Sequence, residues 1–497
     1  MVWFAFITYI IITLFIGWYA QRSNDDGKDF WTAGRSLGGF SVGLSISAGF
    51  MSVSWSCVYA VQLFYWYGIG AVWLITIPWV IALTGIYYLS KKYHNLDSFS
   101  QPEMIAKRFD KKTKKIVAAA LTFVFLVWAG AEIYVAGTLL APGLNISKEW
   151  VILIISLVVG VYGTMGGFRA VVMTDKLQFF IVAIYISLIA VLAYIGLKSD
   201  STATSSILKD ISIIDVVKGA KSGTSWYDFI SPGWTIIVLT LIAYLPGWIF
   251  ETDLWLRVQA AKDEKAAKKG VIIAGINSTL FVGVFPAFIG ISALFIFPME
   301  GVNFPTIIGT EGDAIFSALV LKFAPEWLQV AFSVGLVAAA MSTIDTCINV
   351  MALSIGYDLG EIQKRKNPEL KSKLITIASV IMAFLFALNT ESLWDIFYLS
   401  SGILTTAVAF PVAAVFIKKA NTNGVFWSSV SGFAGTIIFY FLESKNLLIE
   451  IEPVWLQQSQ MGYILWGIVF AVIGYFLGED LGKEAGRQRG KEKTMRD

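Results

Sequence analysis

The sequence is poor in charge, cysteine and histidine. Only 15% of its 497 residues are charged, and it contains two cysteines and one histidine. Cys57 and Cys347 both lie in long apolar segments, so a disulfide framework is not indicated. His94 lies in a polar segment, where a solvated surface residue is expected. The sequence also has no HExxH motif, no His–Asp cluster and no Walker loop, so it does not indicate an enzyme.

Long apolar runs dominate the rest of the sequence. Hydrophobic residues make up 56% of the chain and form runs of about 17 to 30 residues, the length that a helix needs to cross about 30 Å of hydrocarbon. The first run lacks a basic n-region, so we expect a membrane helix and not a cleavable signal peptide. The sequence thus predicts an all-α integral membrane protein with about thirteen transmembrane helices. The expected spans are 2–20, 37–60, 69–90, 116–142, 150–166, 169–197, 234–251, 270–297, 325–356, 374–390, 393–417, 423–442 and 460–477.

Lysine and arginine are distributed unevenly between the two sides of these spans. Because they accumulate in cytoplasmic loops, we expect a multi-pass plasma-membrane or inner-membrane protein with its N-terminus outside and its C-terminus in the cytoplasm. The net charge of +3 then reflects topology, and no nucleic-acid-binding module is indicated. The expected inner side holds Arg22, Lys28, Arg35, 91–115, Arg169, 257–269, 364–373, Lys418, Lys419 and the tail from Lys483 to Arg496. The expected outer side holds Lys148, Lys198, Lys209, Lys218, Lys221, Lys322 and Lys445.

Two of the expected helices contain residues that disfavour a regular helix. Residues 43–56 are crowded with serine and glycine, and Pro246 and Gly247 interrupt the seventh span. Irregular backbone at this depth is tolerated only where it is buried or lines a cavity, and two broken helices in corresponding positions indicate a transport site. They lie five helices apart, as in two inverted five-helix repeats, 37–197 and 234–419. Close packing by Gly and Ser with a proline kink is the structural alternative.

The remaining segments flank or connect these repeats. We expect residues 1–36 to form an extra N-terminal transmembrane helix and a cytoplasmic loop, and residues 198–233 to form an extracellular loop. Residues 420–480 would add two C-terminal transmembrane helices before a basic cytoplasmic tail, 481–497. This tail is too short to supply the signalling domain that a solute sensor would need.

The ninth span carries oxygen-bearing side chains. Ala339, Ser342 and Thr346 share one face through their i, i+3 and i+7 spacing. Hydroxyl and carbonyl oxygens suit a hard cation, and carbonyls exposed at the break in the second span could complete its shell. Sodium is the expected guest, although such hydroxyls can also bond only to their own backbone. Asp345 favours the functional interpretation, because a carboxylate in hydrocarbon is costly and usually marks a pathway, an ion pair or a proton relay.

Two further carboxylates lie at membrane depth. Asp175, about two turns into the sixth span, would share the inner half of the protein with the residues from Ser342 to Thr346, so a second cation site is geometrically feasible. The structural alternative is a snorkelling pair with Lys176. Glu132, in the fourth span, could meet a cationic solute, carry a proton or accept hydrogen bonds from a neighbouring helix.

Aromatic residues could line a solute pocket. The candidates are Trp55, Trp128, Trp248 and Tyr398. The chain has 18 tryptophans, however, and most of them are expected to face lipid or to anchor the membrane interface. A place in the pocket is therefore a hypothesis for each of the four.

Several motifs resemble the sodium:solute symporter family, whose members have a LeuT-type core of two inverted five-helix repeats with two broken helices. Leu256 replaces the glutamine that the family usually has before the third motif. The motifs occur in the family's order over nearly the whole chain. They are 29–38 (DFWTAGRSLG), 166–178 (GGFRAVVMTDKLQ), 257–262 (RVQAAK) with Lys269 and Gly270, and 338–343 (AAAMST).

The resemblance implies two sodium sites and a solute site. In the family, two carbonyls at the first break, an alanine carbonyl and two hydroxyls hold the main ion. The matching positions are Gly49, Ser52, Ala339, Ser342 and Thr343. The second ion of some members matches Asp175, Ser342, Asp345 and Thr346, with Asp345 replacing a hydroxyl residue. The solute would touch Val53, Ser56 and Tyr398, and Trp55, Glu132 and Trp248 are further candidates.

Together these features predict a sodium-coupled secondary active symporter that imports a small organic solute, such as a sugar, amino acid or carboxylate, by alternating access. Na⁺ is the expected coupling ion, with no organic cofactor. The alternative carrier would couple to protons or another cation through Glu132 and Asp345. A channel is disfavoured, because broken helices around a closed midplane site are typical of carriers. We expect a monomer or a weak homo-oligomer in lipid.

Overall fold

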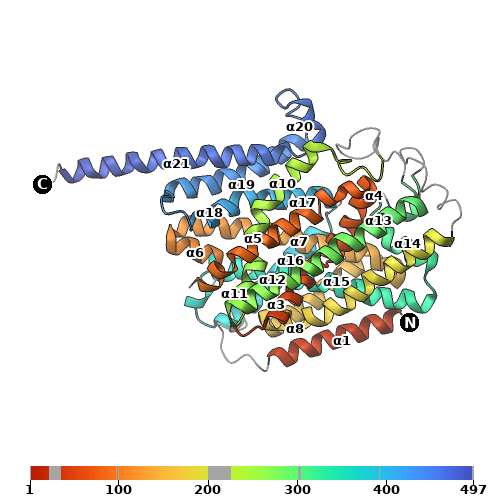
Figure 1. Cartoon of the computed structure of the whole chain (residues 1–497). Coiled ribbons are helices and arrows are strands. Elements are labelled where there is room, and N and C mark those ends of the chain that lie inside the picture. The colour runs from red at the N-terminus through yellow and green to blue at the C-terminus, as the bar shows by residue number, and fades with distance from the viewer. Residues whose placement is uncertain are drawn as a thin grey trace.

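Long apolar helices run side by side through the protein, and the two ends of the chain lie at opposite ends of the bundle (Figure 1). The computed structural model describes residues 2–21, 35–96, 98, 100–199, 225–299, 304–309, 311–390 and 392–494. Within these residues the only β feature is an isolated bridge between Leu37 and Ala261. The expected all-α class is confirmed for the part of the chain that is described. Most of the expected loops 22–36 and 198–233 lie outside it.

The η elements are π-helical or 3₁₀-helical turns that extend or connect α-helices. The first half of the chain forms α1 (Val2–Gln21), α3 (Gly39–Phe50), η2 (Val53–Tyr59), α4 (Ala60–Tyr67), η3 (Gly68–Trp73), α5 (Thr76–Asn95), α6 (Gln101–Arg108), α7 (Lys111–Leu144) and α8 (Lys148–Ser199). The second half forms α10 (Gly233–Ile249), α11 (Thr252–Gln259), α12 (Glu264–Ser278), η4 (Thr279–Val284), α13 (Phe285–Ile296), η5 (Thr306–Ile308), α14 (Ile315–Phe323), α15 (Glu326–Leu353), η6 (Ser354–Leu359), η7 (Ile362–Lys364), α16 (Pro368–Ala387), α17 (Leu393–Ile403), η8 (Leu404–Ala409), α18 (Phe410–Ala414), α19 (Thr422–Ser444), α20 (Val454–Ser459) and α21 (Gly462–Thr494).

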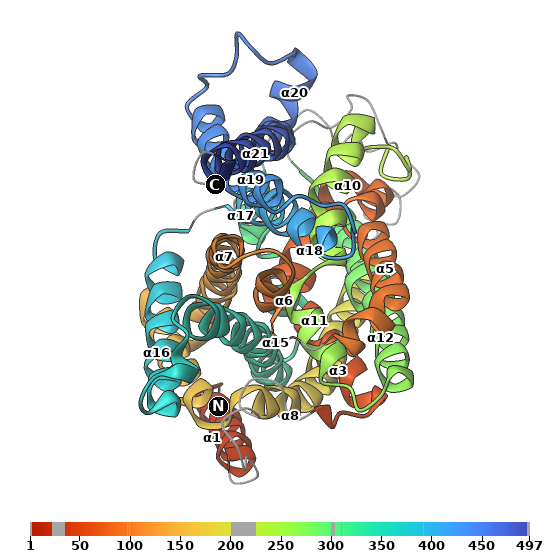
Figure 2. The same ribbon diagram turned by 90° about the vertical axis from the view of Figure 1, so that its left-hand side faces the viewer.

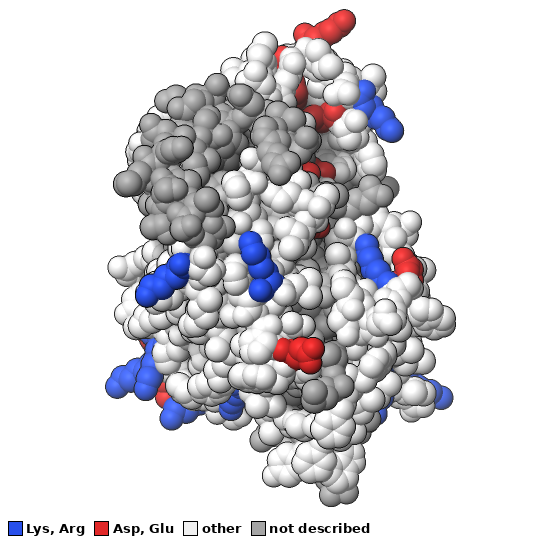
Figure 3. Space-filling view, turned by 90° about the vertical axis from the view of Figure 1, so that its right-hand side faces the viewer, with Lys and Arg blue, Asp and Glu red and all other residues white. Residues whose placement is uncertain are grey.

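Basic segments that are distant in the sequence meet at one end of the bundle. Arg108 at the end of α6 donates to the Lys418 carbonyl at 3.0 Å, and Lys268 near the start of α12 lies over the Tyr87 ring of α5. We call this end, where α7 and α12 begin, the basic end; the C-terminus of α21 points toward it (Figure 1). Figure 3 looks onto the opposite end, where charged side chains of both signs are scattered among uncharged ones.

The number of membrane crossings differs from the expected thirteen. Nine helical segments of the described residues are long and apolar enough to cross a membrane, or ten with the bent pair Gly39–Phe50 and Val53–Trp73. The first helix counts only as a shorter apolar segment, Trp3–Ile16. The count of thirteen is therefore not confirmed.

The expected spans 150–166 and 169–197 fall within one described helix, α8. A straight helix of 52 residues would be about 78 Å long, far more than the hydrocarbon thickness. Its first residue, Lys148, lies over Tyr134 in the C-terminal half of α7, and its residue Gly196 packs on Ile296 at the end of α13. Both neighbours lie away from the basic end, so α8 reverses its direction along its length.

The first expected break is confirmed. α3 ends at Phe50, and the helix that follows is bent by 60° relative to it. The Met51 N–H bonds to the Ser47 carbonyl at 2.9 Å, which leaves the carbonyls of Ala48 and Gly49 without a partner in their own helix. The backbone therefore presents free carbonyl oxygens in the protein interior.

The second expected break, at 244–248, is wrong in position, because α10 remains helical through Pro246. The hydroxyl of Thr405 explains this continuity. The Gly247 N–H donates to Thr405 Oγ1 at 3.1 Å, and Thr405 Oγ1 donates to the Ala243 carbonyl at 2.6 Å. The hydroxyl thus bridges the backbone groups of Gly247 and Ala243, whose direct hydrogen bond the proline ring disturbs.

The interruption lies instead at Phe250 and Glu251, between α10 and α11. Glu251 has an extended conformation, with φ −65° and ψ 132°. The Ile249 carbonyl accepts from Tyr93 Oη at 3.0 Å, and the Phe250 carbonyl accepts from Gln101 Nε2 at 2.8 Å. Side chains from α5 and α6 therefore satisfy the carbonyls at this interruption.

The last two long helices, α19 and α21, pack against each other at the edge of the bundle (Figure 2). Gly424 lies against Tyr475, where an added Cβ would approach within 2.9 Å of the ring and backbone atoms. Helix α21 continues to Thr494, so residues 481–494 of the expected tail extend this helix.

Candidate functional site

Helix α15 places two hydroxyls against the free carbonyls of α3. Ser342 Oγ lies 3.1 Å from the Ala48 carbonyl and 2.9 Å from the Ala339 carbonyl, and Thr343 Oγ1 donates to the Gly49 carbonyl at 3.1 Å. The C-terminal end of a helix also carries partial negative charge. Five neutral oxygens thus converge at a site suited to a small cation.

This cluster includes four of the five residues that the family resemblance matched to the main ion. The exception is Ser52, whose carbonyl accepts from the Ser56 and Cys57 N–H groups, each at 3.2 Å, and whose Oγ accepts from the Trp55 N–H. Ala48 takes its place. It was missed, although the rule that the last carbonyls of a helix lack intrahelical partners could have identified it.

A charged network lies beside this cluster, centred on Arg257 of α11. All five of its N–H groups are engaged. Nε donates to Ser45 Oγ at 2.9 Å, Nη1 donates to Asp253 Oδ2 at 3.0 Å and to the Asp253 carbonyl at 3.4 Å, and Nη2 donates to Thr346 Oγ1 at 2.7 Å and Asp175 Oδ2 at 3.3 Å. Arg257 therefore links α11 to α3, α8 and α15.

The environment of Asp175 excludes the structural alternative, a snorkelling pair with Lys176. The Asp175 side chain is fully buried, pairs with Arg257 and accepts from Ser45 Oγ. The sequence identified Arg257 only as part of a loop motif, and it missed Asp253 and Ser45 altogether. Their roles depend on contacts between segments that are far apart in the chain.

Asp345 directly precedes Thr346 of this network in the sequence. It is 4% exposed, and neither of its carboxylate oxygens has a hydrogen-bond partner among the described residues. Asp175 is close enough for the two charges to interact, and its Oδ1 also has no partner within that part of the chain. Together with Thr346, which donates to the Ser342 carbonyl at 3.1 Å, these groups form an acidic region beside the network.

A cavity opens next to both clusters. Its lining includes Gly49 and Thr343 from the hydroxyl–carbonyl cluster and Thr346 from the charged network. Of the expected solute residues, Trp55, Glu132 and Trp248 line it, as does the candidate Trp128. The other lining residues are Phe50, Ser52, Trp79, Phe125, Glu251, Asp253, Cys347, Phe397 and Ser401.

Three of the expected solute contacts lie away from this cavity. Val53 is fully buried, and Ser56 Oγ donates to the Ser52 carbonyl at 2.9 Å. Tyr398 Oη is 2.7 Å from Thr240 Oγ1, and its ring stacks on Tyr244 with centroids 4.9 Å apart. Tyr398 therefore packs behind the wall of the cavity.

Glu132 ties α7 to the first break. Its carboxylate accepts from the backbone N–H of Ser54 at 3.3 Å and from Ser54 Oγ. This contact agrees with one of the roles considered for Glu132, the acceptance of hydrogen bonds from a neighbouring helix. It also holds the start of η2 against α7.

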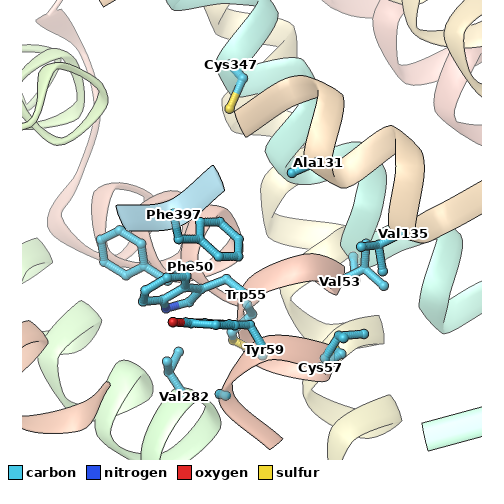
Figure 4. Packing of buried hydrophobic residues seen from close by; sticks show 14 of the residues in the cluster. Phe50, Val53, Trp55, Cys57, Tyr59, Ala131, Val135, Val282, Cys347 and Phe397 are labelled. Atoms are coloured by element: carbon cyan, nitrogen blue, oxygen red, sulfur yellow. The ribbon is translucent and has the colours of Figure 1, made fainter. Parts of the chain in front are cut away.

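The apolar part of the cavity is aromatic on one side. Figure 4 shows the rings of Phe50, Trp55, Tyr59 and Phe397 gathered together, with Cys347 of α15 on a separate helix facing the same interior. Cys57 and Cys347 are both free thiols, as expected. The site thus combines neutral oxygens, carboxylates and aromatic rings around one cavity.

Known proteins of similar sequence are transporters. The sodium/pantothenate symporter of Haemophilus influenzae is 23% identical, over 88% of this chain and 90% of its own. The sodium/proline symporter of Escherichia coli is also 23% identical, over 90% of this chain and 89% of its own.

Solved structures share the fold. The substrate-bound, outward-open structure of a Na⁺-coupled sialic acid symporter superposes with a TM-score of 0.70 at 17% identity, over 96% of this chain and 97% of that one. The model of the sodium:solute symporter family matches residues 30–432, most of the chain. The protein is therefore a member of the sodium:solute symporter family, a membrane transporter that couples sodium to the movement of a small solute.

Proposed function

We propose that the coupling sodium ion binds between the end of α3 and the middle of α15. Its ligands would be the carbonyls of Ala48, Gly49 and Ala339 and the hydroxyls of Ser342 and Thr343. The observation that carries this proposal is that each of the three carbonyl oxygens lies within 3.1 Å of one of the two hydroxyl oxygens. Neutral oxygens are suitable ligands for a hard monovalent cation.

A second sodium ion would bind beside the charged network, between Asp175, Asp345, Ser342 and Thr346. Arg257 supplies one basic group there, whereas Asp175, Asp253 and Asp345 supply three acidic groups. Burying unpaired carboxylates is costly, so a cation at this place would relieve their repulsion. The expected consequence is that Asp345→Asn removes one of the two bound ions, which a measurement of bound sodium per protein would detect.

The solute would bind in the adjoining cavity and move inward with sodium. An ion that bridges α3 and α15 favours the state that binds solute, and by linkage the solute then strengthens sodium binding. Each inward elementary charge contributes about 2.3 kcal/mol at 100 mV. The basic end would face the cytoplasm and the N-terminus the outside. A fluorescent protein fused to the C-terminus should be protected from external protease.

The main ion site can be tested without knowing the solute. Ser342→Ala and Thr343→Ala should each weaken the binding of radioactive sodium to the purified protein by about tenfold, because each removes one ligand of a charged guest. Thr122→Ala is the matched control, since Thr122 Oγ1 bonds back to the Ala118 carbonyl of its own helix at 2.8 Å. Unchanged sodium binding in both site variants would contradict the assignment.

A further inference from the structure

Acidic side chains around the central cavity outnumber basic ones. Three carboxylates, of Glu132, Glu251 and Asp253, line it, and none of the lining residues is lysine, arginine or histidine. The nearby cation is Arg257, whose five N–H groups are all taken by protein acceptors. No guanidinium donor is therefore left to receive an anionic group of a solute.

Glu251 lies beside Asp253 and turns a buried side-chain oxygen toward the cavity region. The residue is 5% exposed, it lines the cavity, and its Oε2 has no hydrogen-bond partner among the described residues. Asp253 gives Oδ2 to Arg257, while its Oδ1 is likewise unpaired within that part of the chain. Because a buried unpaired carboxylate is costly, these oxygens favour a guest with positive charge.

The spacing of the acidic groups argues for an organic cation over a metal ion. In the described ranges, no group of three or more His, Cys, Asp or Glu side chains is arranged to hold a metal. The lining instead combines the neighbouring acidic groups of Glu251 and Asp253, and the separate Glu132, with aromatic rings. An ammonium group on an apolar body matches both features.

The aromatic wall of the cavity is continuous. The Trp79 and Trp248 rings stack at 4.3 Å, Phe50 lies 4.0 Å from Trp79, Trp55 lies 5.4 Å from Trp248, and Phe397 lies 4.7 Å from Trp55. All five rings line the cavity. The faces of such rings attract cations, most strongly those of tryptophan, and attract ammonium groups in particular once water is excluded.

We infer that the solute is a small organic cation, with its ammonium group beside Glu251 and its apolar body against the aromatic wall of Phe50, Trp55, Trp79, Trp248 and Phe397. The inference rests on the proposed function, because it takes the cavity beside the sodium site as the solute site. Glu132, which is engaged by Ser54, adds negative potential to the same cavity.

Three probes with one skeleton and different charges test this inference. Phenethylamine is a cation at neutral pH, phenethyl alcohol is neutral and phenylacetate is an anion. We expect phenethylamine to raise the melting temperature of the purified full-length protein in saturating sodium, and to bind about tenfold more tightly than phenethyl alcohol. Phenylacetate should have no effect. Equal binding of amine and alcohol, preference for phenylacetate, or no binding of any probe would each overturn the inference.

A variant of Glu251 tests whether this residue recognises the ammonium group. Glu251→Gln should lower the affinity for phenethylamine about tenfold, to that of the alcohol, and leave the affinity for phenethyl alcohol unchanged. Glu369→Gln is the control, because Glu369 is exposed on α16 and pairs with Lys373. An unchanged amine affinity in Glu251→Gln would also overturn the inference. Failure of the proposed function differs visibly, because sodium alone would then not stabilise the wild-type protein.

Discussion

The two interrupted helices, α3 and α10, satisfy their backbone in different ways. At the first interruption the partners of the Ala48 and Gly49 carbonyls within the described ranges are hydroxyls of α15, whose hydrogens can rotate away so that both kinds of oxygen face an ion. At the second, the Ile249 and Phe250 carbonyls are already held by side chains of α5 and α6. Only the first interruption therefore offers backbone oxygens to a cation.

The second interruption offers charge instead. It places Glu251 at the cavity and Arg257 two turns further along, within the network of buried carboxylates. The residues around the first interruption, from Ser47 to Ser56, are all uncharged. The difference agrees with the two proposals above, in which the first interruption binds sodium and the second provides the acidic groups that attract the solute.

The largest expected effect comes from replacing Arg257, whose guanidinium group links the two interrupted helices. Arg257→Met would leave Asp175 and Asp253 buried without their partner, at a cost of about 3–5 kcal/mol in the free energy of unfolding. Thermal unfolding of the purified variant in sodium-free buffer measures this loss. Asp253→Asn added to Arg257→Met should recover part of it, since one uncompensated charge is then gone.

Exposed arginine provides the control for that experiment. Arg365, exposed after η7, can be changed to methionine with an expected effect within about 0.5 kcal/mol. A loss in Arg257→Met no larger than in Arg365→Met would mean that the buried network does not hold the two interruptions together.

A smaller loss is expected at the second interruption. Gln101 donates to the Phe250 carbonyl at 2.8 Å and accepts from Thr252 Oγ1 at 2.6 Å. Gln101→Leu leaves both groups unpaired in the interior and should cost about 1–3 kcal/mol of stability. Tyr93→Phe, which removes only the donor to Ile249, should cost about 1 kcal/mol.

The effect of two of these variants on sodium affinity also distinguishes the two interruptions. Gln101→Leu should lower stability and leave sodium affinity nearly unchanged, whereas Ser342→Ala should show the opposite pattern. Measured sodium binding that falls equally in both variants would show that the two interruptions form one cooperative ion site.

The sequence predicted the features that a single segment reveals. The apolar runs, the Ser- and Gly-rich interruption and the spacing of Ser342 and Thr346 all follow from local pattern, and the family resemblance added Gly49, Ala339 and Thr343. Asp345 also stood out, because a carboxylate in an apolar run is rare. These positions include most of the oxygens that the structure brings together.

What the sequence could not reveal depends on partners from other helices. Proline and glycine marked 244–248 as a break, but the hydroxyl of Thr405 compensates there, and nothing in the local pattern points to a residue so distant in the chain. Gln101 and Arg257 are similar cases, since both lie in polar segments that usually face solvent. Their burial is set by packing, and local propensity does not report it.

The smallest expected effect tests this compensation at Pro246. Thr405→Val removes the bridge between Gly247 and Ala243 and should cost about 1 kcal/mol in the free energy of unfolding. Pro246→Ala alone should change stability by less than about 0.5 kcal/mol, because the Thr405 hydroxyl already satisfies the Gly247 N–H and the Ala243 carbonyl. In the double variant the proline ring no longer keeps the Gly247 N–H and the Ala243 carbonyl apart. These two groups can then bond directly, and the cost of Thr405→Val should shrink.

A double-mutant cycle measured by thermal unfolding gives the coupling between Thr405 and Pro246 directly. Strictly additive losses would mean that Thr405 does not compensate for the proline, and the helical path of α10 through Pro246 would need another cause.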